Sequence, residues 1–163
     1  MKTIASVITA VAILAGGASL VVAQGHSHVI QTAADAAWGP APPVLPTGAQ
    51  IAVLSGDPTK PVAYAVRLKF PANYAIPAHS HPTDENVVVT SGAVTFGMGD
   101  KLDRTAPANK TLGVGGYALM PANMNHFAYT ATETTIVLYG QGPVEFKYVN
   151  PADDPRNGRA ATK

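Results

Sequence analysis

The chain has 163 residues, of which 47% are hydrophobic, and its formal net charge at pH 7 is +1. This length fits one domain with a substantial apolar core, and the balanced charge, without a basic stripe, argues against nucleic acid as a partner. Because the chain contains no cysteine, disulfides and thiolate metal ligands are excluded.

The first 23 residues have the pattern of a secretory signal peptide. Lys2 precedes an uncharged and largely apolar run over residues 4–22, and small or modest residues lie before Ala23. We therefore expect cleavage after Ala23 and a periplasmic or secreted protein that has no membrane contact once cleaved. A membrane anchor that stays attached, or a different cleavage position, is the alternative.

Residues 24–45 are predicted to form an N-terminal arm. A short strand is expected near Val29-Ile30, followed by a proline-rich stretch, and Trp38 is expected to anchor the arm by packing against the main body. A projecting arm with a strand is a natural means of pairing with the sheet edge of a second subunit, so we expect a homodimer.

The mature N-terminus carries a second possible metal site. If cleavage follows Ala23, the amine, two backbone amides and the imidazole of Gln24-Gly25-His26 form a square-planar chelate for Cu(II) or Ni(II). The alternative is that these residues merely begin a polar linker, and cyclisation of Gln24 would remove the amine.

From residue 46 the sequence predicts an all-β domain that extends to residue 150. Seven to nine short strands are separated by Gly- and Pro-rich turns, and no helix longer than ten residues is indicated, which is typical of a sandwich or barrel. Residues 99–110 are expected to form an exposed loop, in which a short helix is possible, and residues 151–163 a polar tail. The clearest strand signals are at 51–54, 64–70, 86–90, 93–98, 117–120, 125–130, 134–139 and 144–149.

Three histidines and a glutamate are the candidate metal ligands. His79 and His81 are two residues apart, so on a strand they point to the same face, Glu85 follows after three residues, and His126 comes from a distant strand. Three imidazoles and one carboxylate suit Fe, Mn, Zn, Ni or Cu but offer too few oxygens for calcium or magnesium. The alternative is a hydrogen-bonded and inert pair of histidines.

The spacing of these residues resembles the two motifs of the cupin superfamily. The first, G-x5-H-x-H-x3/4-E-x6-G, fits residues 73–92, with Asn73 in place of the opening Gly. The second, G-x5-P-x-G-x2-H-x3-N, fits residues 115–130, with Asn123 in place of Gly and Thr130 in place of Asn. Asn adopts left-handed backbone more readily than most residues, so Asn73 is a tolerable change, whereas Asn123 puts the geometry of its turn in question.

The resemblance implies a single-domain cupin, a jelly-roll β-barrel with one divalent metal on His79, His81, Glu85 and His126. It implies open coordination positions for water or substrate. We expect an exported metal-dependent enzyme acting on a small organic molecule, with a dioxygenase as the first hypothesis, in which the metal performs the chemistry and Glu85 is a possible catalytic residue. The alternative is a non-catalytic barrel that binds metal or a small ligand as a sensor, carrier or buffer; a purely structural metal is a third possibility.

Strand alternation from the inward-facing ligands predicts the residues that line the pocket. Side chains two residues apart share a face, which gives an apolar lining suited to a small aromatic or aliphatic substrate. For any single residue of this set, ordinary core packing is the favoured alternative. Asp84 and Arg67 are expected to face outward. The predicted lining residues are Tyr64, Val66, Val87, Phe96, Met98, Ala128 and Thr130.

Overall fold

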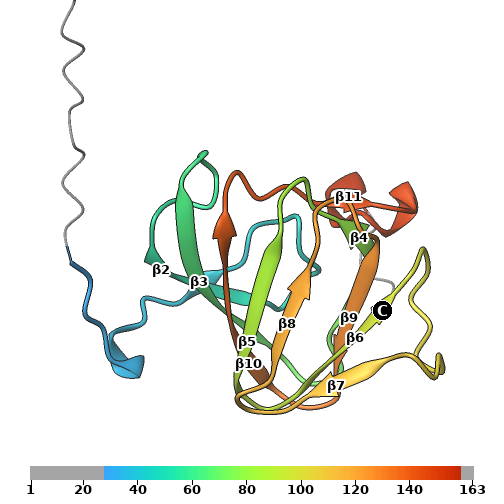
Figure 1. Ribbon diagram of the computed structural model, residues 1–163, viewed down its shortest axis with the longest axis horizontal. Helices are drawn as coiled ribbons and strands as arrows, with labels where there is room; N and C mark the ends of the chain where they lie inside the picture. Colours follow the sequence, from blue (N-terminus) through green and yellow to red (C-terminus); the bar gives the residue numbers. More distant parts are fainter. Residues whose placement is uncertain (1–27, 159–163) are drawn as a thin grey trace, which may run out of the picture.

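Two antiparallel sheets face each other and enclose an apolar interior (Figure 1). The structure, a computed structural model, describes residues 28–158. One sheet has the strand order β1-β2-β3-β10-β5-β8 and the other the order β11-β4-β9-β6-β7. The strands are β1 (Gly39–Pro40), β2 (Gln50–Ser55), β3 (Ala63–Phe70), β4 (Ala75–Ser80), β5 (Glu85–Ser91), β6 (Val94–Met98), β7 (Lys110–Leu112), β8 (Tyr117–Met120), β9 (His126–Thr130), β10 (Thr134–Gln141) and β11 (Lys147–Tyr148).

Strand alternation builds the core as the sequence predicts. In β3, every second residue from Tyr64 to Phe70 is buried, and in β5 Val87 and Val89 are buried together with Glu85. Burying a large apolar side chain contributes about 1.5–3 kcal/mol, so these inner faces hold the two sheets together. The predicted all-β jelly-roll architecture is confirmed.

A bulge in β4 changes which side chains face inward. The pairing of β4 with β9 shifts register between Ile76 and His79, which are three positions apart and would face opposite sides of a regular strand, yet both line the interior cavity. A bulge inserts one unpaired residue and so reverses the alternation beyond it. Because of this shift, both the apolar residue and the histidine point into the barrel.

The two asparagines that replace motif glycines occupy left-handed backbone. Asn73 has φ of 59° and Asn123 has φ of 61°, the region that glycine adopts most easily and asparagine next. The turn at Asn123 therefore keeps the glycine-like conformation. Thr130, in the place of the motif Asn, donates from Oγ1 to the carbonyl of Pro71 at 3.0 Å.

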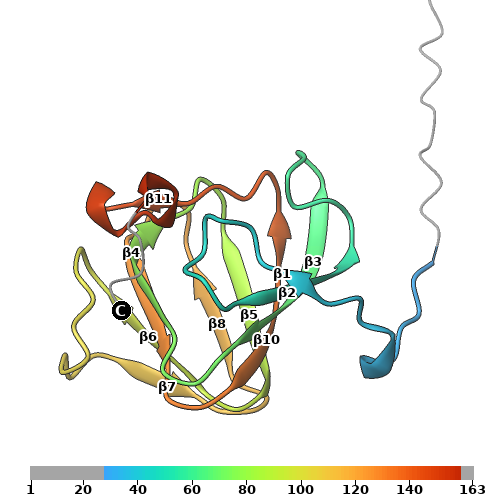
Figure 2. The same cartoon turned by 180° about the vertical axis from the view of Figure 1, so that it is seen from behind.

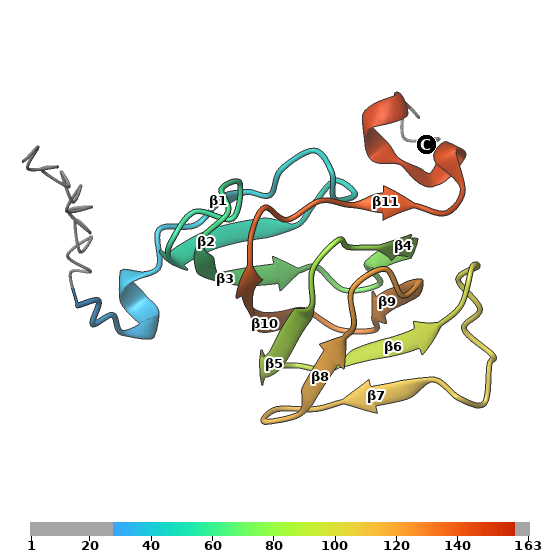
Figure 3. The ribbon, with the colours of Figure 1, turned by 45° about the horizontal axis from the view of Figure 1, so that its top comes forward.

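The N-terminal arm is attached to the barrel near Trp38. The Lys69 ammonium lies 4.6 Å from the centre of the Trp38 ring, and β1 pairs with the first residues of β2. The strand expected near Val29-Ile30 is not present, and both residues are exposed. The arm, drawn in blue, lies to one side of the barrel (Figure 3), where Val29 borders a surface pocket with Leu54 and Arg67. A strand needs a partner for its backbone groups, and among the described residues of the arm, 28–45, only β1 pairs with another strand.

The C-terminal segment closes one end of the barrel. The predicted strand over 144–149 is reduced to β11, which pairs with the end of β4, and two 3-10 turns, η2 (Pro151–Asp153) and η3 (Pro155–Asn157), follow. Residues 99–109 form a loop, as expected. A further 3-10 turn, η1 (Ala33–Asp35), lies in the arm. The predicted signal peptide lies outside the described residues; within them, no helix is long and apolar enough to cross a membrane.

Candidate metal centre

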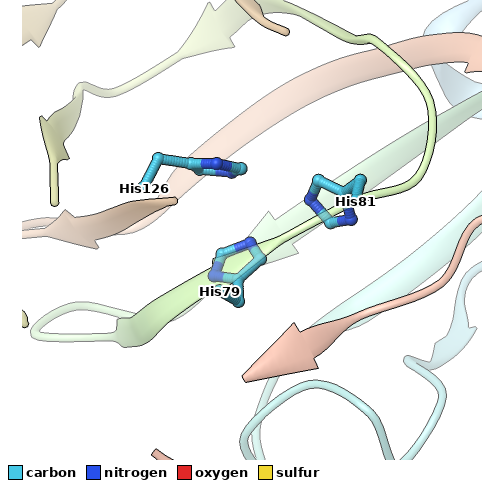
Figure 4. A group of neighbouring side chains, drawn as sticks. All are labelled: His79, His81 and His126. Carbon is cyan, nitrogen blue, oxygen red and sulfur yellow. The ribbon is translucent and has the colours of Figure 1, made fainter. Parts of the chain in front are cut away.

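Three histidines from two neighbouring strands converge inside the barrel (Figure 4). His79 lies near the end of β4, His81 directly after it, and His126 begins β9, with the Cα of His79 paired with that of His126. One ring nitrogen of each lies within 4.8 Å of one of each of the others, and all three side chains are buried. An ion with bonds of about 2.1 Å separates opposite ligands by about 4.2 Å, so three buried histidines could bind one metal here after small adjustments.

Each imidazole is oriented by a backbone carbonyl. His79 Nδ1 lies 2.7 Å from the carbonyl oxygen of Pro77, His81 Nδ1 lies 2.7 Å from that of Glu145, and His126 Nδ1 lies 3.0 Å from that of Met124. A carbonyl oxygen only accepts, so each Nδ1 carries the proton and donates it. The Nε2 lone pair of each neutral ring is therefore left available, the arrangement that metal-binding histidines use.

Two of these Nε2 atoms have no hydrogen-bond partner. His81 Nε2 and His126 Nε2 are buried and unpartnered within residues 28–158. The two oxygens of Glu85 lie 3.4 Å from His81 Nε2 and 3.6 Å from His126 Nε2. An unprotonated ring nitrogen and an ionised carboxylate are both acceptors, so they cannot hydrogen-bond to each other. A buried polar atom without a partner costs about 1–3 kcal/mol, and a bound cation would satisfy both nitrogens and the carboxylate.

The electrostatics favour a neutral imidazole at His79 beside an ionised Glu85. Burial, followed by the neighbouring His126 and His81, lowers the pKa of His79 to about 3. Burial alone would raise the pKa of Glu85, but the neighbouring His126, His81 and His79 hold this pKa below its ordinary value. Neutral imidazole and ionised carboxylate are the forms that bind a divalent metal.

His79, His126 and Glu85 border a small, largely apolar cavity. It has a volume of about 30 Å³, room for one or two water molecules. Phe146 lines it and stacks on His79, with ring centres 4.7 Å apart, while contacting His81 edge-on at 4.5 Å. Metal-bound ligands in this cavity would therefore be surrounded by hydrocarbon and shielded from bulk water.

The predicted lining residues divide among three places. Val87, Phe96 and Ala128 line the cavity beside the histidines, and Tyr64 and Val66 line a separate apolar cavity next to it. Thr130 is buried at the far end of the barrel, away from the ligands.

The assignment of Met98 to the pocket is wrong. Half of its side chain is exposed, and it lines neither cavity. Met98 is the last residue of β6 and is paired with His126, the first residue of β9. Alternation predicts the face of a residue but not where the barrel ends, so a terminal residue can lie at the rim. Asp84 and Arg67 are not part of the cavity wall, as expected.

Several contributors to the site could not be found from the sequence. Phe146 comes from a segment predicted only as a strand, and Leu45 comes from the predicted arm, yet both line the cavity. The three carbonyls that orient the imidazoles are backbone groups, which leave no trace in residue type. The predicted chelate at Gln24, Gly25 and His26 lies outside the described residues.

Several solved structures have a similar fold. A putative acetylacetone dioxygenase from Methylibium petroleiphilum is 19% identical with a TM-score of 0.58, covering 81% of this chain and 88% of its own. An RmlC-like cupin from Shewanella frigidimarina is 14% identical with a TM-score of 0.53, covering 77% of this chain and 96% of its own. A polyketide cyclase from Streptomyces resistomycificus is 15% identical with a TM-score of 0.54, covering 66% and 75%.

At these identities the structures establish the fold and not the activity. Comparison with curated proteins gives no match. The family match is more specific, because residues 26–145 match the ChrR cupin-like domain. That range includes both histidine motifs and all but the last strand of the barrel, and the chain therefore belongs to the ChrR cupin-like domain family of the cupin superfamily.

Proposed function

We propose that this protein is an exported metalloenzyme that binds one divalent transition metal through His79, His81, Glu85 and His126 and acts on a small organic substrate. The observation that carries the proposal is the pair of buried, unpartnered Nε2 atoms of His81 and His126, which face the Glu85 carboxylate. Three imidazoles and one carboxylate suit Fe, Mn, Zn, Ni or Cu.

The residues of the chain prepare the site for catalysis. The carbonyls of Pro77, Met124 and Glu145 fix the imidazoles as donors of Nε2 lone pairs, and the apolar wall excludes bulk water. Glu85, whose pKa is held low, offers a carboxylate that can bind the ion. A metal bound here would supply Lewis acidity, or the binding of dioxygen if it is iron.

Oxidation by dioxygen is the first candidate reaction. Apart from the proposed ligands, the residues that line the cavity are apolar, so no side chain there is available as a general acid or base and the chemistry falls to the metal. Proteins of this fold include a putative acetylacetone dioxygenase, a polyketide cyclase and a dimethylsulfoniopropionate (DMSP) lyase. The fold therefore does not choose the reaction.

Metal content and turnover test the proposal together. We expect the protein purified from its native compartment to hold about one ion per chain by plasma mass spectrometry. His126→Ala should lose most of the metal, whereas His28→Ala, a matched change of an exposed histidine in the arm, should retain it. With Fe(II) loaded, oxygen uptake is measured with acetylacetone as the first probe, and Glu85→Gln should abolish any uptake while the circular dichroism spectrum is unchanged.

A non-catalytic role in metal or ligand binding is the second candidate. It is favoured by the volume of only about 30 Å³ beside the histidines, which leaves little space for a substrate. Four-coordinate zinc with no open position, unchanged by candidate substrates in X-ray absorption spectra, would support a sensor, carrier or buffer and contradict the enzyme.

Export and dimerisation are part of the proposal. Cleavage after Ala23 would place the protein in the periplasm or outside the cell and would make Gln24, Gly25 and His26 the mature N-terminus. A second Cu(II) or Ni(II) ion would bind there only if the Gln24 amine stays free. Intact-mass measurement of the native protein fixes the mature N-terminus, and a mass that retains residues 1–23 would contradict export by cleavage. Light scattering after size-exclusion chromatography distinguishes the proposed homodimer from a monomer.

A further inference from the structure

A second cavity lies directly beside the metal centre. Its volume is about 150 Å³, and it shares Leu45, Leu68, Leu138 and Phe146 with the smaller cavity that borders the histidines. Phe146 stands at the boundary, because the ring that lines both cavities also packs on His79 and His81. A molecule in the larger cavity would therefore be one aromatic ring away from the metal ligands.

Three segments close the larger cavity over the inner face of β3. The β1–β2 loop contributes Pro42 and Val44, the loop before β3 contributes Pro58, and the segment between β10 and β11 contributes Val144. The β1–β2 loop, drawn in cyan, runs below the segment that joins β10 to β11 (Figure 2). Hydrogen bonds tie the closure together, from Val144 N to the carbonyl of Pro58 at 2.7 Å and from Tyr148 Oη to the carbonyl of Val44 at 2.7 Å.

The size and lining of this cavity select a class of ligand. Almost every residue that lines it is hydrocarbon, with Tyr64 and Thr59 as the polar exceptions. A cavity of about 150 Å³ with aliphatic and aromatic walls holds one benzene-sized molecule. The walls offer no charged group to bind a sugar phosphate or a carboxylate.

One polar atom in the cavity wall is without a partner. Tyr64 is only 5% exposed, and its Oη makes no hydrogen bond within the described part of the chain. Gly140 pairs with Tyr64 on one side and with Glu85 on the other, and a Cβ built on Gly140 would lie 3.5 Å from Tyr64 Oη. Because Gly140 has no side chain, the Tyr64 ring can lie over its backbone, and Oη points toward β5, the strand that carries Glu85.

We propose that the larger cavity binds the apolar body of a small molecule about the size of one six-membered ring, and that Tyr64 Oη hydrogen-bonds its single oxygen. This proposal rests on the proposed function, because it assigns the substrate class of the same metal centre. Tyr64 is then a positioning residue that holds the oxygen-bearing end of the molecule toward the strand that carries Glu85. Because no protein group pairs with Tyr64 Oη, this hydroxyl is available to hydrogen-bond a ligand oxygen in the cavity.

Binding of benzene and phenol to the metal-loaded full chain tests the proposal. Chemical-shift titration should show both probes binding, with a Kd for phenol about fivefold lower, the value of one additional hydrogen bond. Tyr64→Phe should leave benzene binding within about twofold and abolish the preference for phenol. Val144→Phe, which fills the cavity without touching the smaller one, should weaken both probes at least about tenfold, whereas Val53→Phe, on the exposed side of β2, should change neither.

Three outcomes would overturn the proposal: no benzene binding to the wild type, unchanged binding by Val144→Phe, or a preference for phenol that survives Tyr64→Phe. The metal content of every variant is measured in parallel by plasma mass spectrometry. Metal retained with no probe binding rejects the cavity assignment alone, whereas probe binding in a chain that does not take up metal rejects the metal centre and keeps the cavity.

Discussion

His79 carries the strongest consequence of burial among the described histidines. Its pKa is lowered to about 3 from 6.5 because charging it inside the barrel is unfavourable and His126 and His81 lie beside it. Between about pH 3 and pH 6.5, His79 is therefore protonated in the unfolded chain but neutral in the folded chain. The stabilisation is therefore complete above pH 6.5 and is lost as the pH falls toward 3. Glu85, with a lowered pKa, acts in the same direction below 4.5.

Acidification should destabilise the metal-free protein. Between pH 7.5 and 5.0 we expect the free energy of unfolding to fall by about 2 kcal/mol on account of His79, as measured by urea titration with tryptophan fluorescence. His79→Gln, which cannot titrate, should flatten this dependence, and His28→Ala should leave it unchanged. A wild-type free energy that is the same at both pH values would contradict the assignment.

Left-handed backbone at Asn123 fixes the turn that leads into His126. The backbone amide of Asn123 donates to the carbonyl of His81 at 2.7 Å. This hydrogen bond connects the turn before His126 to the segment that carries His81. Asn123→Ala should lower the free energy of unfolding by about 1–2 kcal/mol, because alanine is strained at a φ of 61°, and Asn123→Gly should stay close to the wild type. Urea titration of both variants measures this difference, and equal stabilities would show that backbone strain is not the cause.

For single strands, the sequence predicts which side chains face the interior, because this depends on the alternation of residues along the strand. Alternation placed Val87 and Phe96 inside correctly, and the spacing of the histidines identified the residues that converge. The bulge in β4 left no pattern, since any residue type can be inserted into a strand. Met98 was misplaced because the end of the barrel depends on tertiary structure, and Phe146 was missed because its place depends on how the last segment folds back.

The crossing from β5 to β6, which joins the two sheets, depends on Thr134 of β10. This side chain is fully buried; its Oγ1 donates to the carbonyl of Ala93 at 2.9 Å and accepts from the amide of Ala93 at 3.2 Å. Thr134→Val keeps the shape but leaves the Ala93 amide without a partner. We expect a loss of about 1–3 kcal/mol in the free energy of unfolding.

Thr90→Val is the matched control for this change. The Thr90 hydroxyl donates to the carbonyl of Thr135 at an exposed position, where water can replace it, and we expect a change of less than about 0.5 kcal/mol. Thermal unfolding monitored by circular dichroism compares the two variants. Equal losses would mean that the crossing does not depend on the buried hydroxyl.

For the whole molecule, the proposed metal would link the two strands that carry the ligands to the opposite sheet. The histidines belong to β4, its following residue and β9, whereas Glu85 begins β5 in the other sheet. A ligand that binds only the folded state adds about 2.7 kcal/mol at a free concentration of a hundred times its Kd. We therefore expect chelation to lower the melting temperature by about 5–10 °C.

Differential scanning calorimetry of the protein with and without a chelator measures this shift. His126→Ala should melt at the same temperature in both conditions, because it no longer binds the ion. A wild type whose melting temperature does not respond to the chelator, while retaining bound metal beforehand, would contradict a linkage of the two sheets through the centre.

The anchoring of the three imidazoles on peptide carbonyls has an evolutionary consequence. A carbonyl oxygen is present whatever side chain its residue bears, so Pro77, Met124 and Glu145 can be replaced without deleting the acceptor that orients each ring. Sequence drift at these positions would leave the direction of the lone pairs intact as long as the local chain path persists. Related chains that share little sequence could thus inherit the same ring orientations from the path of the backbone alone.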